Sequence, residues 1–380
     1  QGYQNWFSRT ADGKGEIKQL TQDLRNNRDI TFNADKTKAV YLSGRDEFRI
    51  LDLKSFKSQT VVKDEIWAFQ NSSPSFSPDG NYLLFTAIRN FEQDIFVHDL
   101  KQGQTTNLTN TGVTEAGPYW SPDGKYIYFA SNRTKPSYPT GMQNSSIFRM
   151  ALTNFDQPYR SAKFDELFVI QKKDSTAIKP HVRKKENDAK EKLKADAEKN
   201  KPTSKSIAEP KKAVLVQLDL DCLRDRIEQG SPAFGTQFDP LVIQKGEKSY
   251  LFYSSNHEGK YSAYRTTYEP FTPPKTDKVA EGGMGQFVES GGKYFVLNRG
   301  NIQKYNLDLN KLDAVSMSFK FNRDLEKEFS QMFYETWANL EENFYDSNFH
   351  GVDWEAVKKK YEKYLIGIND RTDLRILLND

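Results

Sequence analysis

Ser77-Pro78-Asp79-Gly80 recurs as Ser121-Pro122-Asp123-Gly124, so one tetrapeptide repeats at an interval of 44 residues. A degraded copy around Asp35 lies a further 44 residues upstream. Each copy follows an aromatic residue and precedes a short apolar run: Phe32 before 39–42, Phe76 before 82–86 and Trp120 before 126–130. A turn that recurs about every 40–45 residues between strands is typical of the blades of a β-propeller. The repeat therefore predicts a mainly β fold.

Alternation of apolar and polar residues predicts six strand pairs along the chain. A four-stranded blade cannot bury both of its faces alone, so blades pack against one another around a common axis. We interpret the pairs as the outer strands of five fairly complete blades and an opening half-blade. The pairs are 6–8 with 16–20, 41–43 with 49–53, 84–86 with 94–100, 128–131 with 146–150, 250–255 with 261–266, and 294–297 with 302–307.

A Lys/Glu-rich segment at 173–212 interrupts this pattern. It contains 13 Lys/Arg and 7 Asp/Glu, a net charge of +6, whereas the whole 380-residue chain has a net charge of +3. The basic excess therefore lies in one low-complexity stretch and not on a folded face, which argues against nucleic-acid binding. Within it, 184–200 has helix-forming composition but almost no apolar stripe, so we expect a solvated inter-blade insertion. The alternative is a docking arm for an acidic partner.

The apolar period changes from two to 3.6 at about Asn322, which predicts an amphipathic helix over 324–345. Asp353 is a suitable N-cap for a second helix that runs to about Leu365, and Asp370 or Thr372 for a third. We therefore expect propeller blades over 1–315 and an all-α helical domain over 316–380. The residues that recur on the apolar face of the first helix are Leu325, Phe329, Met332, Phe333, Trp337, Leu340 and Phe344.

Motifs for catalysis or cofactor binding are missing from the sequence. There is no Gly-Xaa-Ser-Xaa-Gly elbow, His-Glu-Xaa-Xaa-His pair or Gly-rich phosphate loop, and the single cysteine, Cys222, excludes a Cys-rich metal site. We predict no catalytic, cofactor-binding or metal-binding residue. The four histidines are interpreted as structural: His98 in a strand, His181 in the basic segment, His257 in a hairpin turn and His350 in a helix–helix loop. For His350, a catalytic role is the alternative, but no serine or cysteine nucleophile is indicated.

No apolar run approaches the roughly 20 residues that span a bilayer, and the N-terminal residues do not form a signal-peptide pattern. Because the sequence starts at Gln1 and stops within a predicted helix, we expect both ends to be cut from a longer chain.

The stretches after the blades carry a specific family resemblance. Residues 328–337 (EFSQMFYETW), 343–346 (NFYD) and 350–357 (HGVDWEAV) resemble the helical domain of tricorn proteases and their bacterial homologues. The Lys/Glu-rich insertion followed by 216–227 (VQLDLDCLRDRI) is also similar to this family, although Cys222 stands where glycine is usual. The blade turns alone are shared with TolB-type and prolyl-oligopeptidase-type propellers. The resemblance extends over essentially the whole chain.

The resemblance implies a serine peptidase with two propellers, a helical domain, a PDZ-like domain and a catalytic domain, which can assemble as a homohexamer. It implies that this chain contains part of the second, seven-bladed propeller and the start of the helical domain. The family's catalytic histidine, serine and acid fall beyond Asp380, so no catalytic residue is carried over, and His350 corresponds to a structural loop motif.

We therefore expect a non-catalytic portion of a tricorn-like serine peptidase whose propeller gates or channels oligopeptides. Its partners would be peptide substrate and the PDZ-like and catalytic domains, with no nucleic acid, cofactor or membrane span. The alternatives are a TolB-like protein-binding propeller without enzymatic activity and a dipeptidyl-peptidase-type propeller. The latter would require an α/β-hydrolase after the last blade. A periplasmic or secreted location is expected, with the cytoplasm as the alternative.

Overall fold

The computed structural model describes residues 2–66, 73–89, 91–136, 142–154, 214–283, 285–298, 300–318, 320 and 322–380. All of them belong to one of the two units of the chain. The other unit, Asp156–Ala213, contains the predicted helix at 184–200 and His181, which therefore lie outside the described residues.

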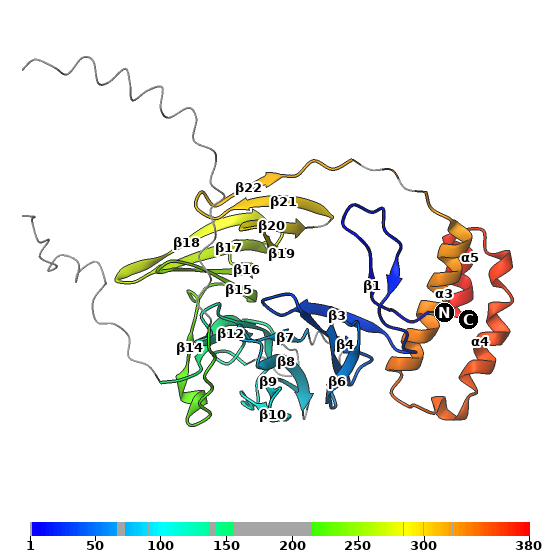
Figure 1. Ribbon diagram of the computed structural model, residues 1–380, viewed down its shortest axis with the longest axis horizontal. Helices are drawn as coiled ribbons and strands as arrows, with labels where there is room; N and C mark the ends of the chain where they lie inside the picture. Colours follow the sequence, from blue (N-terminus) through cyan, green and yellow to red (C-terminus); the bar gives the residue numbers. More distant parts are fainter. Residues whose placement is uncertain are drawn as a thin grey trace, which may run out of the picture. The chain divides into compact units, whose positions relative to one another are not determined.

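The described residues form five antiparallel four-stranded sheets and one two-stranded ribbon (Figure 1). The ribbon pairs β1 (Phe7–Ser8) with β2 (Lys18–Gln19). The first four-stranded sheet consists of β3 (Asn27–Phe32), β4 (Lys38–Ser43), β5 (Glu47–Asp52) and β6 (Ser58–Lys63). The second consists of β7 (Ser75–Phe76), β8 (Tyr82–Arg89), β9 (Glu92–Asp99) and β10 (Gln104–Asn107). Each places its strands in chain order.

The other three sheets follow the same order. They are β11 (Glu115–Trp120), β12 (Tyr126–Ser131), β13 (Ser146–Ala151) and β14 (Ile227–Gln229); β15 (Gln237–Lys245), β16 (Lys248–Ser255), β17 (Ser262–Glu269) and β18 (Thr272–Glu281); and β19 (Gln286–Ser290), β20 (Lys293–Asn298), β21 (Asn301–Asn306) and β22 (Lys311–Ala314). The expected propeller, with five complete blades and a half-blade, is confirmed. The strand pairs predicted for the complete blades are the two middle strands of each sheet, and not the outer ones.

The insertion interrupts a blade, whereas the sequence had placed it between blades. β13 ends at Ala151 and β14 begins at Ile227, yet the two strands pair in one sheet. The chain therefore returns after the insertion to complete the blade that it left. Sequence alternation did not find β14 because the strand has only three residues.

Hydrophobic clusters lie between successive sheets, so the middle sheets are covered on both faces. One cluster joins β4 and β8 through Leu42 and Phe85, and the next joins β9 and β12 through Val97 and Phe129. Two further clusters join the third sheet to the fourth and the fourth to the fifth. This sheet-on-sheet burial is the blade packing that the repeat predicts.

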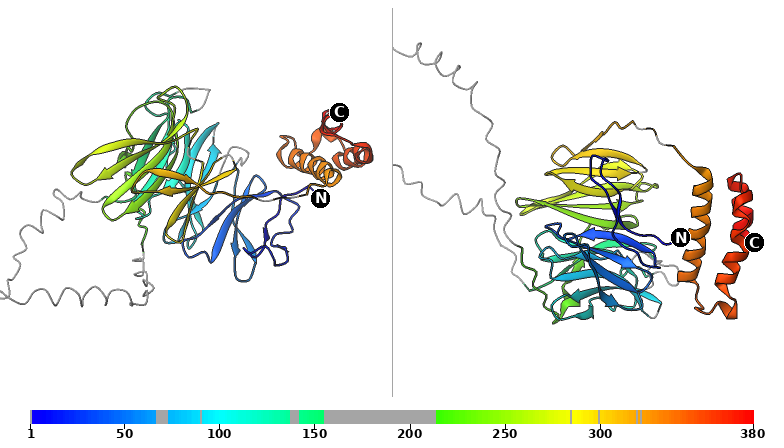
Figure 2. Two further views of the ribbon diagram at one scale, coloured as in Figure 1. Left: turned by 90° about the horizontal axis from the view of Figure 1, so that it is seen from above. Right: turned by 45° about the vertical axis from the view of Figure 1, so that its right-hand side comes forward.

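Three α-helices follow the last sheet: α3 (Leu325–Asn343), α4 (Trp354–Glu362) and α5 (Arg371–Asn379). Phe329 and Phe333 on α3 bury against Leu374 on α5, and Figure 2 shows these helices running alongside each other. The expected N-caps are confirmed, because the side chains of Asp353 and Asp370 accept backbone N–H hydrogen bonds. α4 is shorter than predicted, since a short 3-10 turn at Leu365–Gly367 replaces its expected end.

The two repeated turns hold the chain where it returns from the insertion. The Asp79 side chain closes its own turn by accepting the Asn81 N–H at 3.1 Å, and its second oxygen accepts the Val216 N–H at 3.0 Å. At the second turn, a Cβ atom on Gly124 would lie only 2.9 Å from Val214 Cγ1. Glycine is needed there both for its φ of +70° and for this close approach.

Cys222 lies in the same returning segment and has a left-handed backbone, with φ of +51°. Because glycine adopts this conformation without strain, Cys222→Gly is expected to raise the free energy of unfolding by about 0.5–1 kcal/mol. The side chain is exposed, so little packing is lost. Urea unfolding checks this, with Cys222→Ser as the matched control. A glycine variant no more stable than the serine variant would contradict the prediction.

Candidate functional site

Polar side chains occupy one end of the sheets in matching registers. The row in the first complete sheet is Asn27, Ser43, Glu47 and Lys63 across β3–β6. In the third sheet Glu115 pairs with Ser131, which pairs with Ser146. In the fourth sheet the row across neighbouring strands is Gln237, Ser255, Ser262 and Glu281. Most of these side chains are buried and therefore need partners. This polar end is the candidate functional region.

Glu47 lies between Ser43 and Lys63 in the row of the first complete sheet. Its side chain is 8% exposed, and it accepts hydrogen bonds from Arg49 at 2.8 Å and Arg25 at 3.3 Å. Thr60 donates to the same carboxylate at 3.3 Å, and Lys63 lies 3.4 Å away. Burial acts to raise the pKa of Glu47, but the positive charges of Arg49, Arg25 and Lys63 more than offset burial. The pKa of Glu47 is therefore lowered. The carboxylate is therefore held charged.

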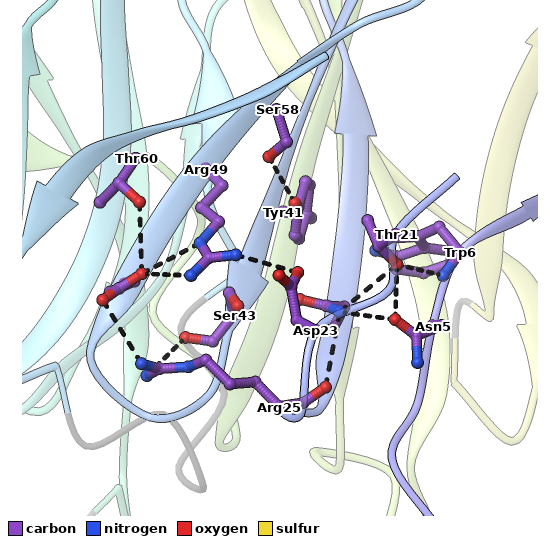
Figure 3. Close-up of polar contacts among 12 residues, drawn as sticks. Asn5, Trp6, Thr21, Asp23, Arg25, Tyr41, Ser43, Arg49, Ser58 and Thr60 are labelled. Atoms are coloured by element: carbon purple, nitrogen blue, oxygen red, sulfur yellow. Dashed lines mark hydrogen bonds and ion pairs between the residues drawn. The ribbon is translucent and has the colours of Figure 1, made fainter. Parts of the chain in front are cut away.

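The same network extends to the opening half-blade. Arg49 pairs with Asp23 at 2.9 Å, and the Thr21 hydroxyl accepts the Trp6 N–H and donates to Asn5 (Figure 3). Trp6 and Leu20 also pack against Tyr41 of the first complete sheet. Polar and apolar contacts together attach the ribbon to this sheet.

Helix α3 contacts the same strands through its last turn. Glu342 accepts the backbone N–H of Asn26 at 2.8 Å and its side-chain amide at 3.2 Å, and it lies 3.9 Å from Arg28. Burial raises the pKa of Glu342. Tyr3 donates to Glu341 and packs its ring edge-on against Trp337. The first helix is thus fastened to residues that precede and begin β3.

A hollow of about 660 Å³ opens beside this contact. Its walls come from the β4–β5 turn, the end of β6 with the residues that follow it, and the end of α3 with the chain just after it. The lining residues are Arg45, Asp46, Lys63, Asp64, Glu65, Ile66, Asn343 and Tyr345.

Glu115 is the most deeply buried acidic member of the polar rows, with 0% exposure. Thr111 donates a hydrogen bond to its carboxyl at 2.6 Å, and Arg133 lies 3.3 Å away. Its other oxygen, Oε2, is buried without a hydrogen-bond partner among the described residues. Burial raises the pKa of Glu115 to about 7, and the nearby Asp94 adds to the effect. Glu115 therefore titrates near neutral pH.

The described histidines lie far from one another in the chain and have separate partners. His98 is buried and pairs its Nδ1 with the Thr105 hydroxyl at 2.9 Å across β9 and β10, and burial lowers its pKa. His257 is 3.1 Å from the Ser255 hydroxyl and packs on Phe234.

His350 is exposed, in the loop between α3 and α4. Its Nδ1 lies 3.1 Å from Asp346, and its Nε2 contacts the Tyr345 hydroxyl. Asp346 also accepts the backbone N–H groups of Asn348 and His350. These contacts fasten the loop, and the hydroxyl beside the histidine belongs to tyrosine rather than serine. The structural role predicted for His350 remains a prediction.

The described part of the chain contains neither a cluster of metal-ligating side chains nor a membrane-spanning helix. No three His, Cys, Asp or Glu side chains gather there as a metal site. None of the described helices is long and apolar enough to span a bilayer.

The sequence had singled out none of the polar rows, although a weak signal exists. Asn27 and Glu115 each stand five positions before the aromatic residue of a repeated turn, Phe32 and Trp120. Asn71 has the same position before Phe76 but lies outside the described residues. The contact of Glu342 with Asn26 has no such signal, because 316 residues separate the two.

Comparison with known families gives two matches. Residues 41–216 match the TolB beta propeller domain, and residues 325–380 match the tricorn protease C1 domain. A comparison with curated protein sequences gave no significant match.

Solved structures with the same fold include the tricorn protease, at 15% identity and a TM-score of 0.62. The match covers 96% of this chain and 33% of the tricorn protease, so the chain spans about a third of that protein's length. TolB from Acinetobacter baumannii matches at 14% identity and a TM-score of 0.44, covering 79% of this chain and 56% of that one. Oligogalacturonate lyase from Vibrio parahaemolyticus matches at 10% identity and a TM-score of 0.45. This match covers 84% of this chain and 73% of the lyase.

Proposed function

We propose that this chain forms the propeller and helical portion of a tricorn-like serine peptidase that degrades oligopeptides, because its blades match the TolB beta propeller domain and its helices match the tricorn protease C1 domain. The observation that carries the proposal is the order of the two matched domains, because a C1 domain directly after a propeller is what the tricorn resemblance predicts. We place the boundary at 315–316, between the end of β22 at Ala314 and the start of α3 at Leu325.

In this proposal the propeller gates or channels peptide substrate, and the helices join it to PDZ-like and catalytic domains. The contact of α3 with the opening strands supports a fixed connection, because Glu342 ties the helix to Asn26 by two hydrogen bonds. Assembly as a homohexamer and a periplasmic location are parts of the same proposal, with the cytoplasm as the alternative location.

A TolB-like propeller that binds a protein partner without catalysis is the second candidate. The match of residues 41–216 to the TolB beta propeller domain favours it. The match of α3–α5 to the C1 domain favours the peptidase, because those helices lie outside the propeller.

An active-site-directed fluorophosphonate distinguishes the two candidates. The purified 380-residue chain is expected neither to react with this reagent nor to hydrolyse fluorogenic peptides. Antibodies raised against the chain are expected to capture from the source cells a polypeptide well above 43.9 kDa that the reagent labels. Labelling of the purified chain would refute the non-catalytic assignment. Capture of an unlabelled polypeptide alone would refute the peptidase and favour the binding propeller.

A further inference from the structure

The hollow beside α3 combines an apolar floor with charged walls. Ile66 is 1% exposed and belongs to the hydrophobic cluster of the first two complete sheets, so it forms a rigid base. Tyr345 presents an aromatic side chain that is largely exposed. A volume of about 660 Å³ falls within the roughly 300–1,000 Å³ of small-ligand sites.

Most of the charged groups that line the hollow already have ion-pair partners in the protein. Asp46 pairs with Arg25, Lys63 lies 3.4 Å from Glu47, and Asp64 lies 2.7 Å from Arg89. These groups are neutralised by residues behind the walls and offer little net charge to a ligand.

Arg45 and Glu65 are the exceptions, since neither has an ion-pair partner among the described residues. Arg45 makes one long contact, 3.5 Å, with the carbonyl of Phe344 at the end of α3. Glu65 lies just beyond β6, where its backbone carbonyl accepts a hydrogen bond from Arg89 of β8, while its carboxylate has no cation partner among the described residues. Among its described lining residues, the hollow therefore presents one unpaired positive group and one unpaired negative group, from different walls.

We propose that this hollow binds a short peptide with free termini, whose carboxylate contacts Arg45 and whose ammonium group contacts Glu65. An arginine guanidinium can hold a carboxylate through two parallel hydrogen bonds, and a carboxylate is the natural partner of an ammonium group. The exposed ring of Tyr345 contacts the peptide's side chains, above the buried base that Ile66 forms. The choice of a peptide as the ligand rests on the proposed function. The requirement that both of its termini be free comes from the two unpaired charges in the hollow.

Calorimetric titration of the 380-residue chain with tetra-alanine tests the site. The probes are the free peptide, its N-acetyl form and its C-terminal amide. Each blocked terminus is expected to weaken binding about tenfold, the equivalent of one charge-assisted hydrogen bond of about 1.4 kcal/mol.

Variants then assign each terminus to its residue. Arg45→Ala is expected to abolish the preference for the free acid over the amide but keep the preference for the free amine. Glu65→Gln is expected to do the reverse. Arg375→Ala and Glu16→Gln remove exposed charges elsewhere and should leave both preferences intact.

The proposal is overturned if free and blocked peptides bind the unaltered chain equally, if millimolar tetra-alanine gives no heat, or if the variants keep both preferences. The comparison of free and blocked peptides uses the unaltered chain, so it tests the proposed site even if a variant fails to fold. Fluorophosphonate labelling does not involve this hollow. A failure of the peptide site therefore leaves the peptidase proposal intact, and a failure of the labelling experiment leaves the measured peptide binding intact.

Discussion

Glu47→Ala is expected to lower the free energy of unfolding by about 3 kcal/mol. Removing one partner of a buried ion pair leaves the remaining charges without compensation, which typically costs about 3–5 kcal/mol. We expect the lower end of this range because both arginines retain another ion-pair partner in the variant: Asp23 for Arg49 and Asp46 for Arg25. The substitution also removes the acceptor for Thr60. Urea unfolding at neutral pH gives the value.

Asp46→Ala is the matched control, because Asp46 is the next residue and shares Arg25 as its partner. The Asp46 side chain is 32% exposed against 8% for Glu47, so its loss should cost less than about 1 kcal/mol. Since the folded state lowers the pKa of Glu47, its stabilising effect is present above the ordinary value of 4.5 and is lost as the pH falls through the lowered value. The Glu47→Ala deficit should therefore shrink in acid. Equal losses for the two variants would contradict the prediction.

The blade repeat could be predicted from the sequence because three successive blades carry the same kind of local turn. Ser77 and Asp79 close one turn with hydrogen bonds between residues only two to five positions apart, and Ser121 and Asp123 do the same. Such local chemistry is visible in the sequence. The helix caps Asp353 and Asp370 were predictable for the same reason.

The features that the sequence did not reveal depend on contacts between distant residues. β14 is three residues long and pairs with β13 across the insertion, so its place is set by pairing rather than by periodicity. The hollow combines residues near position 45, near 65 and near 344, and no local pattern joins them. A buried polar residue at a strand end also looks like a solvated one in the sequence. Glu115 is the clearest case.

Substituting that residue, Glu115→Gln, is expected to change how stability depends on pH. Burial raises the pKa of Glu115 to about 7 in the folded chain, against an ordinary value of 4.5. Below pH 4.5 the carboxyl is protonated in both states, and its titration does not affect stability. Between 4.5 and 7 the unfolded state loses its proton first, so the free energy of unfolding falls as the pH rises. The total fall is about 3 kcal/mol, from about 1.4 kcal/mol per pH unit.

The glutamine side chain is neutral at every pH and can still accept the hydrogen bond from Thr111. The difference in unfolding free energy between Glu115→Gln and the unaltered chain should therefore move in favour of the variant by about 3 kcal/mol from pH 4.5 to pH 8. Urea titrations across this range measure it, and Glu16→Gln, in an exposed loop, should show a flat difference. A flat difference for Glu115→Gln as well would mean that Arg133 keeps the buried carboxylate charged. The hydrogen-bonded Glu115–Arg133 pair would then outweigh the cost of burial.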